Sequence, residues 1–348
     1  MPKIKVLIVD DSAFMRRIIK QMLEYDPEVE VIGTARDGME GAEMALSLSP
    51  DVITMDLEMP RMDGLEATDI IMEKNPTPII VVSSLTHEGA KATFNALDRG
   101  AADYISKNLT TSAFDMMKIQ GELVSKIKAI AHKKKRLFGI GNIKKSEPVV
   151  VPRKGFVTQN ITFVAVGAST GGPRAIQEVL SHLPGNLTTP ILVAIHMPKA
   201  FTGAFAQRLN ELSELSVKEA EEGERIRPGN VFLAPGGAQT RIRRRGLTDC
   251  YIEISDVPGD SIYKPSVDIS LESVANCYPG RSMGVILTGM GHDGREGMRV
   301  IKEKGGKTIA QNEETCTVYG MPRAVAEAGL ADKVVPLDRI ASEIINMI

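Results

Sequence analysis

Uninterrupted apolar runs alternate with stretches of helical periodicity over the first 107 residues. Such runs are typical of parallel strands buried on both faces, whereas apolar residues spaced along one face are typical of helices. The predicted strands are Ile4–Val9, Glu30–Thr34, Val52–Met55, Ile79–Val82 and Asp103–Ser106, and the predicted helices between and after them are Ser12–Leu23, Met39–Leu48, Leu65–Lys74, Ala90–Leu97 and Ser112–Lys134. This alternation predicts an α/β fold with a flavodoxin-like, doubly wound, five-stranded parallel sheet.

The pattern breaks after residue 134, where lysine, arginine, glycine and proline crowd a stretch with little periodicity. We expect a basic linker over residues 135–158, and we interpret its charges as a solvated hinge rather than a nucleic-acid patch. A stretch with these glycines and prolines has low secondary-structure content. The linker therefore separates two folded parts.

A second α/β pattern begins near Ile161. Its predicted strands are Ile161–Val166, Ile191–Ile195, Val231–Ala234, Tyr251–Ile254, Met283–Leu287 and Lys307–Ala310, and its predicted helices are Arg174–Leu183, Thr202–Leu212, Val267–Asn276, Arg295–Lys304 and Pro322–Ala328. The stretch from Ser216 to Ser255 is β-rich and hairpin-like. We expect domains at 1–134 and 159–348, the second built on another parallel sheet.

Composition narrows the class of protein. The net charge of −2 argues against a general binder of nucleic acids or membrane surfaces. No apolar run approaches the ~18 residues of a membrane span, and no signal peptide precedes the first strand, so we expect a cytoplasmic protein. The three cysteines are not closely paired, which fits a reducing compartment and buried thiols.

Three aspartates are predicted to converge at one edge of the first sheet. Asp10 and Asp11 end the first strand and Asp56 ends the third, and these strands are neighbours in the flavodoxin-like order. Clustered carboxylates repel one another, so a divalent cation is implied, and Mg²⁺ suits ligands that are all oxygens. Ser83 and Lys107 follow the fourth and fifth strands, where they could bind a phosphoryl group on Asp56.

These residues lie in spaced motifs: Val9-Asp10-Asp11-Ser12, Met55-Asp56-Leu57-Glu58-Met59-Pro60, Met62-Asp63-Gly64, Ser83-Ser84, and Tyr104 ahead of Lys107. Residues 1–107 thereby resemble a response-regulator receiver domain. The resemblance implies that Asp56 accepts phosphate from a histidine kinase. It implies Mg²⁺ bound directly by Asp11, Asp56 and the backbone carbonyl of Glu58, with Asp10 acting through water. It also implies a phosphorylation switch of Ser83, Tyr104 and Lys107. Asn108 stands where the family usually has proline.

A serine lies on a predicted strand-to-helix turn of the second domain. Gly167-Ala-Ser169-Thr-Gly171 has the G-x-S-x-G spacing of a nucleophile turn, which needs small residues. A serine needs a base, and His196 follows the strand Ile191–Ile195 at the same predicted sheet edge, with His292 as the rival. Asp293 follows a third strand and would orient the base, and the N–H of Met290 would be an oxyanion donor.

Two glycine patterns point elsewhere. Gly167–Gly172 has P-loop spacing, but Pro173-Arg174 replaces the required lysine and hydroxyl residue. Gly289–Gly294 satisfies G-x-G-x-x-G, and Glu313 follows it about 20 residues on, which leaves a dinucleotide-dependent oxidoreductase as an alternative. Against that alternative, an aspartate inside the loop would repel a pyrophosphate.

The order Ser, His, Asp and several motifs resemble the chemotaxis protein-glutamate methylesterase family, CheB. The matching stretches are Gly167–Pro173, Ala194–Pro198, Val231–Gly237, Pro265–Asp268 and Leu287–Gly294. The resemblance implies that Ser169 is the nucleophile, His196 the base and Asp293 its orienter, and that Thr170 helps to shape the site.

The function that follows is hydrolysis of glutamyl methyl esters on chemoreceptors, activated by phosphorylation of a receiver that otherwise covers the catalytic cleft. The same site is implied to deamidate receptor glutamines. We expect Mg²⁺ for receiver phosphorylation and no cofactor for ester hydrolysis. The expected partners are a chemotaxis histidine kinase and methyl-accepting chemoreceptors, with no nucleic acid, no membrane insertion and a monomeric chain. A catalytically idle receiver-containing adaptor is the remaining alternative.

Overall fold

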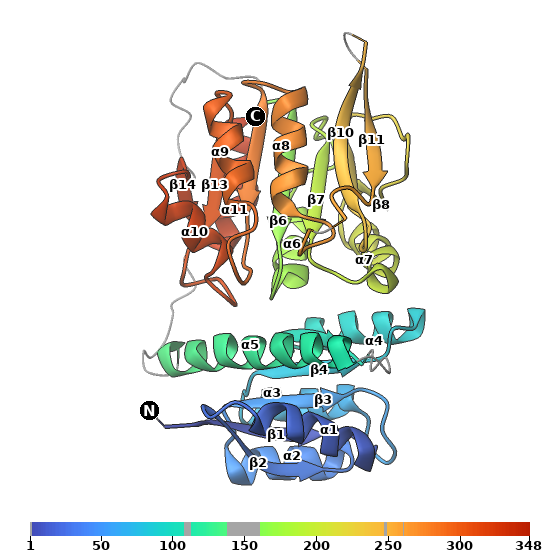
Figure 1. The fold of residues 1–348 in the computed structure, drawn as a ribbon, viewed down its shortest axis with the longest axis vertical. Coiled ribbons are helices and arrows are strands. Elements are labelled where there is room, and N and C mark those ends of the chain that lie inside the picture. Colours follow the sequence, from blue (N-terminus) through green and yellow to red (C-terminus); the bar gives the residue numbers. More distant parts are fainter. Residues whose placement is uncertain (1, 108–112, 138–160, 247–248, 260) are drawn as a thin grey trace.

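The computed structural model describes residues 2–107, 113–137, 161–246, 249–259 and 261–348. Asn108 and most of the predicted linker lie outside the described residues. The described chain forms two α/β units, each built on a parallel sheet (Figure 1).

The N-terminal unit is a five-stranded sheet in the order β2-β1-β3-β4-β5, which confirms the predicted fold class. Its strands are β1 (Ile4–Val9), β2 (Val29–Ala35), β3 (Val52–Asp56), β4 (Ile79–Ser83) and β5 (Asp103–Ser106), and its helices are α1 (Ala13–Glu24), α2 (Gly38–Leu48), α3 (Gly64–Lys74), α4 (His87–Asp98) and α5 (Ala113–Leu137). Because β1 and β3 are hydrogen-bonded neighbours, the residues that follow them meet at one edge.

Capping residues explain why helices begin directly after strand ends. The side chain of Ser12 accepts a hydrogen bond from the Met15 N–H and starts α1 two residues after Asp10. Asp63 and Glu66 form a reciprocal capping box at the start of α3. The loop between β1 and α1 is therefore short, and Asp10 and Asp11 stay close to the end of β1.

The C-terminal unit is a seven-stranded sheet in the order β14-β13-β12-β6-β7-β9-β8, with a separate antiparallel hairpin, β10–β11. Its strands are β6 (Phe163–Ala168), β7 (Ile191–Ile195), β8 (Ser216–Glu219), β9 (Asn230–Leu233), β10 (Gln239–Arg245), β11 (Asp249–Ser255), β12 (Ser282–Ile286), β13 (Lys307–Gln311) and β14 (Lys333–Val335). Its helices are α6 (Gly172–Ser181), α7 (Lys199–Leu212), α8 (Val267–Cys277), α9 (Arg295–Glu303), α10 (Met321–Glu327) and α11 (Leu337–Met347). β12, β6 and β7 are parallel neighbours, so their carboxyl ends lie together.

The structure divides the predicted hairpin-like stretch and adds elements at the C-terminal end. β8 and β9 join the parallel sheet, and only β10 and β11 pair as a hairpin. No prediction covered β14 and α11. β14 has only three residues, two of them exposed, so no apolar run marks it in the sequence. The three cysteines are buried, as expected.

The two units contact each other at the carboxyl edge of the larger sheet, where α4 and α5 lie opposite α6 and α7 (Figure 1). Phe94 of α4 stacks on Phe205 of α7 with ring centroids 5.0 Å apart, and it meets Phe201 edge-on at 6.3 Å. Tyr104 of β5 stacks on Phe201 at 4.9 Å. These rings form a continuous aromatic contact between the units.

A polar contact borders the aromatic one. Asp98, at the end of α4, accepts a hydrogen bond from the Gln177 side chain at 3.0 Å and one from Arg208 at 2.5 Å. Gln177 belongs to α6 and Arg208 to α7. Asp98 of the first unit therefore accepts hydrogen bonds from two helices of the second unit.

Candidate active site

Ser169 occupies the turn between β6 and α6, as the small-residue pattern predicted. Its N–H donates to the Thr288 carbonyl at 3.0 Å, and its own carbonyl accepts from the Gly172 N–H at 2.7 Å. Gly171 has φ +73°, and a β-carbon there would lie 2.4 Å from the Thr317 side chain. Only glycine suits this turn, because it combines positive φ with close packing.

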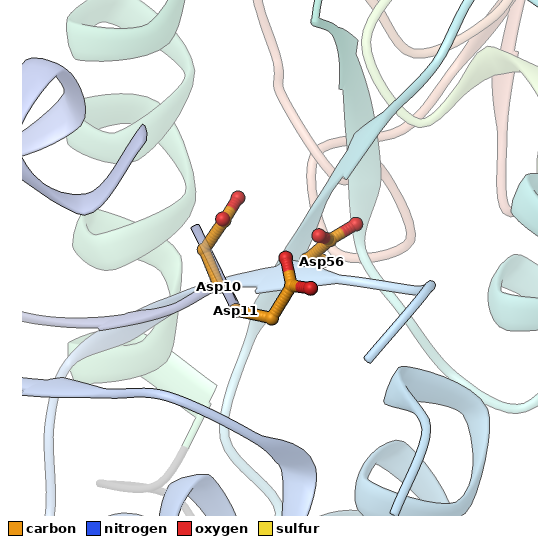
Figure 2. Close-up of side chains that lie close together, drawn as sticks. All are labelled: Asp10, Asp11 and Asp56. Atoms are coloured by element: carbon orange, nitrogen blue, oxygen red, sulfur yellow. The ribbon is translucent and has the colours of Figure 1, made fainter. Parts of the chain in front are cut away.

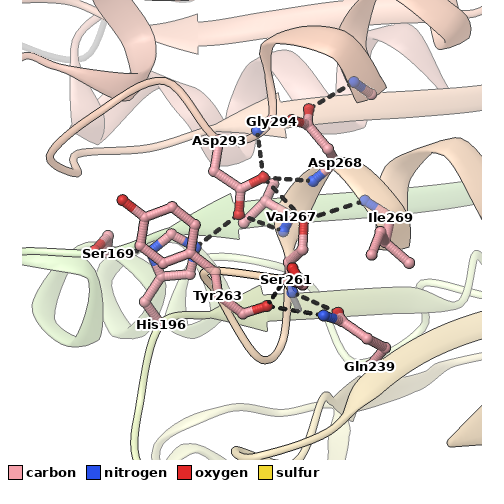
Figure 3. Close-up of polar contacts among 12 residues, drawn as sticks. Ser169, His196, Gln239, Ser261, Tyr263, Val267, Asp268, Ile269, Asp293 and Gly294 are labelled. Atoms are coloured by element: carbon pink, nitrogen blue, oxygen red, sulfur yellow. Dashed lines mark hydrogen bonds and ion pairs between the residues drawn. The ribbon is translucent and has the colours of Figure 1, made fainter. Parts of the chain in front are cut away.

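His196 leaves β7 beside this turn and lies between a hydroxyl and a carboxylate. Its Nδ1 is 3.1 Å from the Ser169 Oγ, and its Nε2 is 2.7 Å from the Asp293 Oδ2 (Figure 3). An ionised carboxylate only accepts hydrogen bonds, so Nε2 carries the proton and donates to Asp293, and Nδ1 is free to accept from Ser169. The rival His292 is exposed on the loop after β12.

Asp293 is buried among backbone donors at the start of α8. It accepts hydrogen bonds from the N–H groups of Val267 (2.7 Å) and Asp268 (3.0 Å) and from the Ser266 hydroxyl (3.0 Å). Burial alone would raise the pKa of Asp293, but the hydrogen bond and charge of His196 and these N–H groups outweigh it and lower the pKa to about 2. His196, together with the N–H groups at the start of α8, thus keeps this carboxylate ionised.

Asp268 lies next to Asp293 in the opposite electrostatic situation. Its Oδ1 accepts one hydrogen bond, from the Gly297 N–H at 2.7 Å. Burial, together with the negative charge of Asp293, raises the pKa of Asp268 to about 6. The pKa values of the two neighbouring carboxyls are therefore shifted in opposite directions, because His196 and the N–H groups outweigh burial at Asp293, whereas burial dominates at Asp268.

The loop after β12 also packs against the serine. A β-carbon on Gly289 would lie 3.0 Å from the Ser169 β-carbon, so the backbone entering Met290 runs directly beside the serine. Thr170 is buried, and its hydroxyl has no hydrogen-bond partner among the described residues. Met290 and Thr170 therefore both border Ser169.

Two neighbours of the site had no predicted role. The ring of Tyr263 stacks on His196 with centroids 4.0 Å apart and planes 4° apart (Figure 3). Ser266 lies within the Pro265–Asp268 motif, which matched a family pattern but suggested no chemistry. A hydroxyl residue before an apolar helix is a capping signal and could have marked Ser266, whereas no sequence signal marks Tyr263.

The predicted acidic cluster forms in the N-terminal unit. Ligand oxygens of Asp10, Asp11 and Asp56 all lie within 4.8 Å of one another (Figure 2). Lys107 Nζ lies 2.5 Å from the Asp56 Oδ2 and 3.2 Å from the Asp10 Oδ2. Burial and the charge of Asp56 raise the pKa of Asp10, although Lys107 opposes this shift. An oxygen-only set of three carboxylates fits Mg²⁺.

Most of the remaining predicted receiver residues lie close to Asp56. A cavity of about 30 Å³ lies between Asp56, Ser83 and Lys107. The Ser83 hydroxyl donates to the Gly89 carbonyl at 3.1 Å. The Glu58 N–H is 3.4 Å from the Asp56 Oδ1. Tyr104 lies farther off, buried against Phe201 at the contact with the C-terminal unit.

Comparison with known families decides the assignment of the chain. Residues 164–344, more than half of the chain, match the family model described as CheB methylesterase. The chain belongs to the CheB methylesterase family. Residues 6–117 match the response regulator receiver domain model, so the chain combines both modules.

Relatives of the same family match along their whole length. A Geobacter sulfurreducens protein named protein-glutamate methylesterase/protein-glutamine glutaminase 1 is 49% identical, covering 99% of this chain and 98% of its own. A Geobacter metallireducens protein named protein-glutamate methylesterase/protein-glutamine glutaminase 5 is 50% identical. The match covers 98% of this chain and 97% of that protein. The crystal structure of the Thermotoga maritima CheB methylesterase catalytic domain is 40% identical with a TM-score of 0.52, covering 54% of this chain and all of that one.

No helix among the described residues has the length and apolar character needed to cross a membrane.

Proposed function

We propose that this CheB-family chain is a phosphorylation-activated protein-glutamate methylesterase, with Ser169, His196 and Asp293 as its catalytic residues. The observation that carries the proposal is the hydrogen-bonded chain from Ser169 through His196 to Asp293. Its three members follow three adjacent strands, β6, β7 and β12. The names of the full-length relatives supply the substrate class.

Acylation begins at Ser169. The Oγ attacks the carbonyl carbon of a glutamyl methyl ester while Nδ1 of His196 takes the hydroxyl proton. Asp293 stays ionised and stabilises the imidazolium through Nε2–H. The tetrahedral intermediate collapses when His196 returns the proton to the departing methoxide, which leaves as methanol.

Deacylation repeats the same steps with water. His196 takes a proton from water, the hydroxide attacks the acyl-serine, and Ser169 leaves as the glutamate carboxylate forms. The same acyl chemistry acts on a glutamine side chain, with ammonia as the leaving group. The second activity in the relatives' names, glutaminase, supports this extension.

The backbone N–H of Met290 is proposed to stabilise the oxyanion, because Gly289 brings this strand-to-helix loop against Ser169. Thr170, buried beside the serine, shapes the same pocket. Neither role requires a cofactor, and ester hydrolysis is proposed to proceed with none.

The N-terminal unit is proposed to act as the receiver, with Asp56 as the phosphoacceptor. Asp10, Asp11, Asp56 and the Glu58 carbonyl would hold Mg²⁺, which supplies positive charge against the phosphoryl oxygens. Lys107 and Ser83 would contact the remaining oxygens. Ser83 would then give up its hydrogen bond to the Gly89 carbonyl, and Tyr104 would change its packing against Phe201.

Control of the catalytic site follows from where the receiver lies. Met290 and Val318, both from loops beside Ser169, pack with the apolar cluster that includes Leu123 of α5. The receiver thus covers the edge of the sheet that a receptor helix must reach. Phosphorylation is proposed to weaken this contact and open the site.

The remaining proposals concern the domain boundaries, the cellular location, the oligomeric state and the partners of the chain. We propose domains at 1–134 and 159–348, a cytoplasmic and monomeric chain, a chemotaxis histidine kinase as phosphodonor and methylated chemoreceptors as substrates.

Methanol release from methylated receptor membranes tests the proposal, with and without a small phosphodonor plus Mg²⁺. We expect release that rises with the phosphodonor, loses that rise in Asp56→Ala, and falls at least about a thousandfold in Ser169→Ala. A folded wild-type chain that releases no methanol under either condition would favour the adaptor alternative. Ammonia release from receptor glutamines would be the next assay.

A further inference from the structure

We infer that Tyr263 is a positioning residue for the proposed ester hydrolysis, and that its ring holds the His196 imidazole in the plane that joins Ser169 to Asp293. The inference deepens the proposed function and rests on it. Tyr263 contacts the face of the His196 ring and is not a member of the hydrogen-bonded chain from Ser169 to Asp293.

The first observation is the geometry of the stack. The two rings are nearly parallel, at 4° with centroids 4.0 Å apart, and Tyr263 covers one face of His196 (Figure 3). Both nitrogens of His196 remain at the ring edge, where they meet Ser169 and Asp293. A ring that tilts about its Cβ–Cγ bond would lengthen both hydrogen bonds together, and the covering ring opposes that tilt.

The second observation is how Tyr263 itself is held. Gln239, wholly buried at the start of β10, donates from Nε2 to the Tyr263 carbonyl at 2.8 Å. Its Oε1 accepts from the Ser266 N–H at 2.8 Å. Ser266 in turn donates to Asp293 at 3.0 Å. The buried amide of Gln239 therefore links Tyr263, which stacks on His196, to Ser266, which donates to Asp293.

The chemistry of the phenol suits this task. Burial and the charge of Asp293 raise the pKa of Tyr263, so its ring is neutral at physiological pH. The face of a neutral aromatic ring attracts a cation, so the stack also favours the imidazolium that forms during acylation. The ring face supplies both effects, and the hydroxyl is not needed for either.

Three substitutions in the full-length protein separate the ring from the hydroxyl and from the loop. Tyr263→Phe keeps the ring, Tyr263→Leu removes it, and Ile262→Ala alters the exposed neighbour on the same loop. Should Tyr263→Leu fail to fold, Tyr263→Met fills similar space without a flat ring. Thermal unfolding of each variant monitors folding.

Methanol release with phosphodonor and Mg²⁺ is measured across substrate concentrations. We expect Tyr263→Leu to lower kcat about 10- to 100-fold with KM changed less than about twofold, because a misaligned base slows chemistry more than binding. Tyr263→Phe and Ile262→Ala should stay within about threefold of wild type. The inference is overturned if Tyr263→Leu raises KM alone, if it leaves kcat unchanged, or if Tyr263→Phe is equally impaired.

A second readout separates this inference from the proposed function. A fluorophosphonate probe phosphonylates the serine Oγ with loss of fluoride, and this step needs the base but no receptor. If wild type releases no methanol, the proposed substrate is wrong, and the labelling rate of Ser169 still tests Tyr263. Labelling should slow by a similar factor in Tyr263→Leu and recover in Tyr263→Phe, and equal rates would refute the role of the ring.

Discussion

At the scale of single residues, the environment of Asp293 decides how the site works. Its carboxylate accepts several hydrogen bonds from the start of α8 in addition to the one from His196. The pKa of about 2 means that it stays ionised throughout the range in which a histidine base operates. The helix terminus therefore sets the tautomer of the base through this one carboxylate.

Asp293→Asn tests this dependence. The amide keeps the shape of the side chain but can donate to Nε2, which would place the ring proton on the nitrogen that faces Ser169. We expect kcat for methanol release to fall about 10³- to 10⁴-fold with an unchanged far-UV circular dichroism spectrum. A loss of less than about tenfold would contradict the assigned orientation of the ring.

Asp268 offers a test by pH. Its pKa, raised to about 6 by burial and by Asp293, means that the folded state binds this proton more tightly than the unfolded state does. Its stabilising contribution is therefore complete below about pH 4 and is lost as the pH rises through about 6.

Asp268→Asn removes the titration and retains an acceptor for the Gly297 N–H. Relative to wild type, the free energy of unfolding of the variant should improve by roughly 2 kcal/mol between about pH 4 and pH 8. Denaturant titrations at both pH values measure this difference. A difference that does not change with pH would show that the proton of Asp268 is not linked to folding.

At the scale of elements, the contact of α4 with α6 and α7 is proposed to set the basal activity. The aromatic rings of Phe94, Phe201 and Phe205 bury the centre of this contact, and Asp98 supplies its polar border. α7 begins directly after the loop that carries His196. The receiver helix α4 therefore packs against a helix that follows directly on a residue of the proposed active site.

Asp98→Ala should raise methanol release by the unphosphorylated chain about two- to fivefold. The variant removes the partner of both Arg208 and Gln177, and a partly exposed ion pair of this kind contributes at most about 1 kcal/mol. Asp69→Ala is the matched control, because it removes an exposed ion pair with Arg99 inside the receiver. Equal effects of the two variants would argue against control through α4.

At the scale of the whole molecule, the two units have separate chemistries that meet at one face. The acidic cluster lies in the receiver, and the serine site lies in the larger sheet. The first is proposed to depend on Mg²⁺, and the second is proposed to need no metal. Metal removal and domain removal should therefore affect activity differently.

Chelation of divalent cations should abolish the stimulation of methanol release by a small phosphodonor and leave basal release within about twofold. The reason is that Asp10, Asp11 and Asp56 lie close enough to need a cation when Asp56 gains phosphoryl charge. Restoring Mg²⁺ should restore stimulation. Loss of basal release on chelation would place a metal in the esterase step.

Deletion of residues 1–150 should give higher activity than the unphosphorylated whole chain. The larger sheet has an apolar cluster made only of its own residues, including Phe163, Phe232 and Leu271, so it can fold without the receiver. The solved catalytic domain of the Thermotoga maritima relative is consistent with this. Lower activity of the truncated chain, from a folded sample, would refute inhibition by the receiver.

The sequence by itself determined the two parallel sheets and the residues at their strand ends. Continuous apolar runs mark strands buried on both faces, and parallel strands bring their carboxyl ends to one edge. Ser169, His196 and Asp293 could therefore be chosen by residue type and position. The short edge strand β14 and the division of β8 to β11 could not, because they carry no strong pattern of their own.

Only the tertiary structure decided the surroundings of these residues. The stack of Tyr263 on His196, the amide link through Gln239, and the contact of α4 with α7 all join segments that are distant in sequence. Periodicity reports which face of an element is buried, but it does not report which other element covers that face. The proposed catalytic residues could thus be chosen from local pattern, whereas their orientation depends on long-range packing.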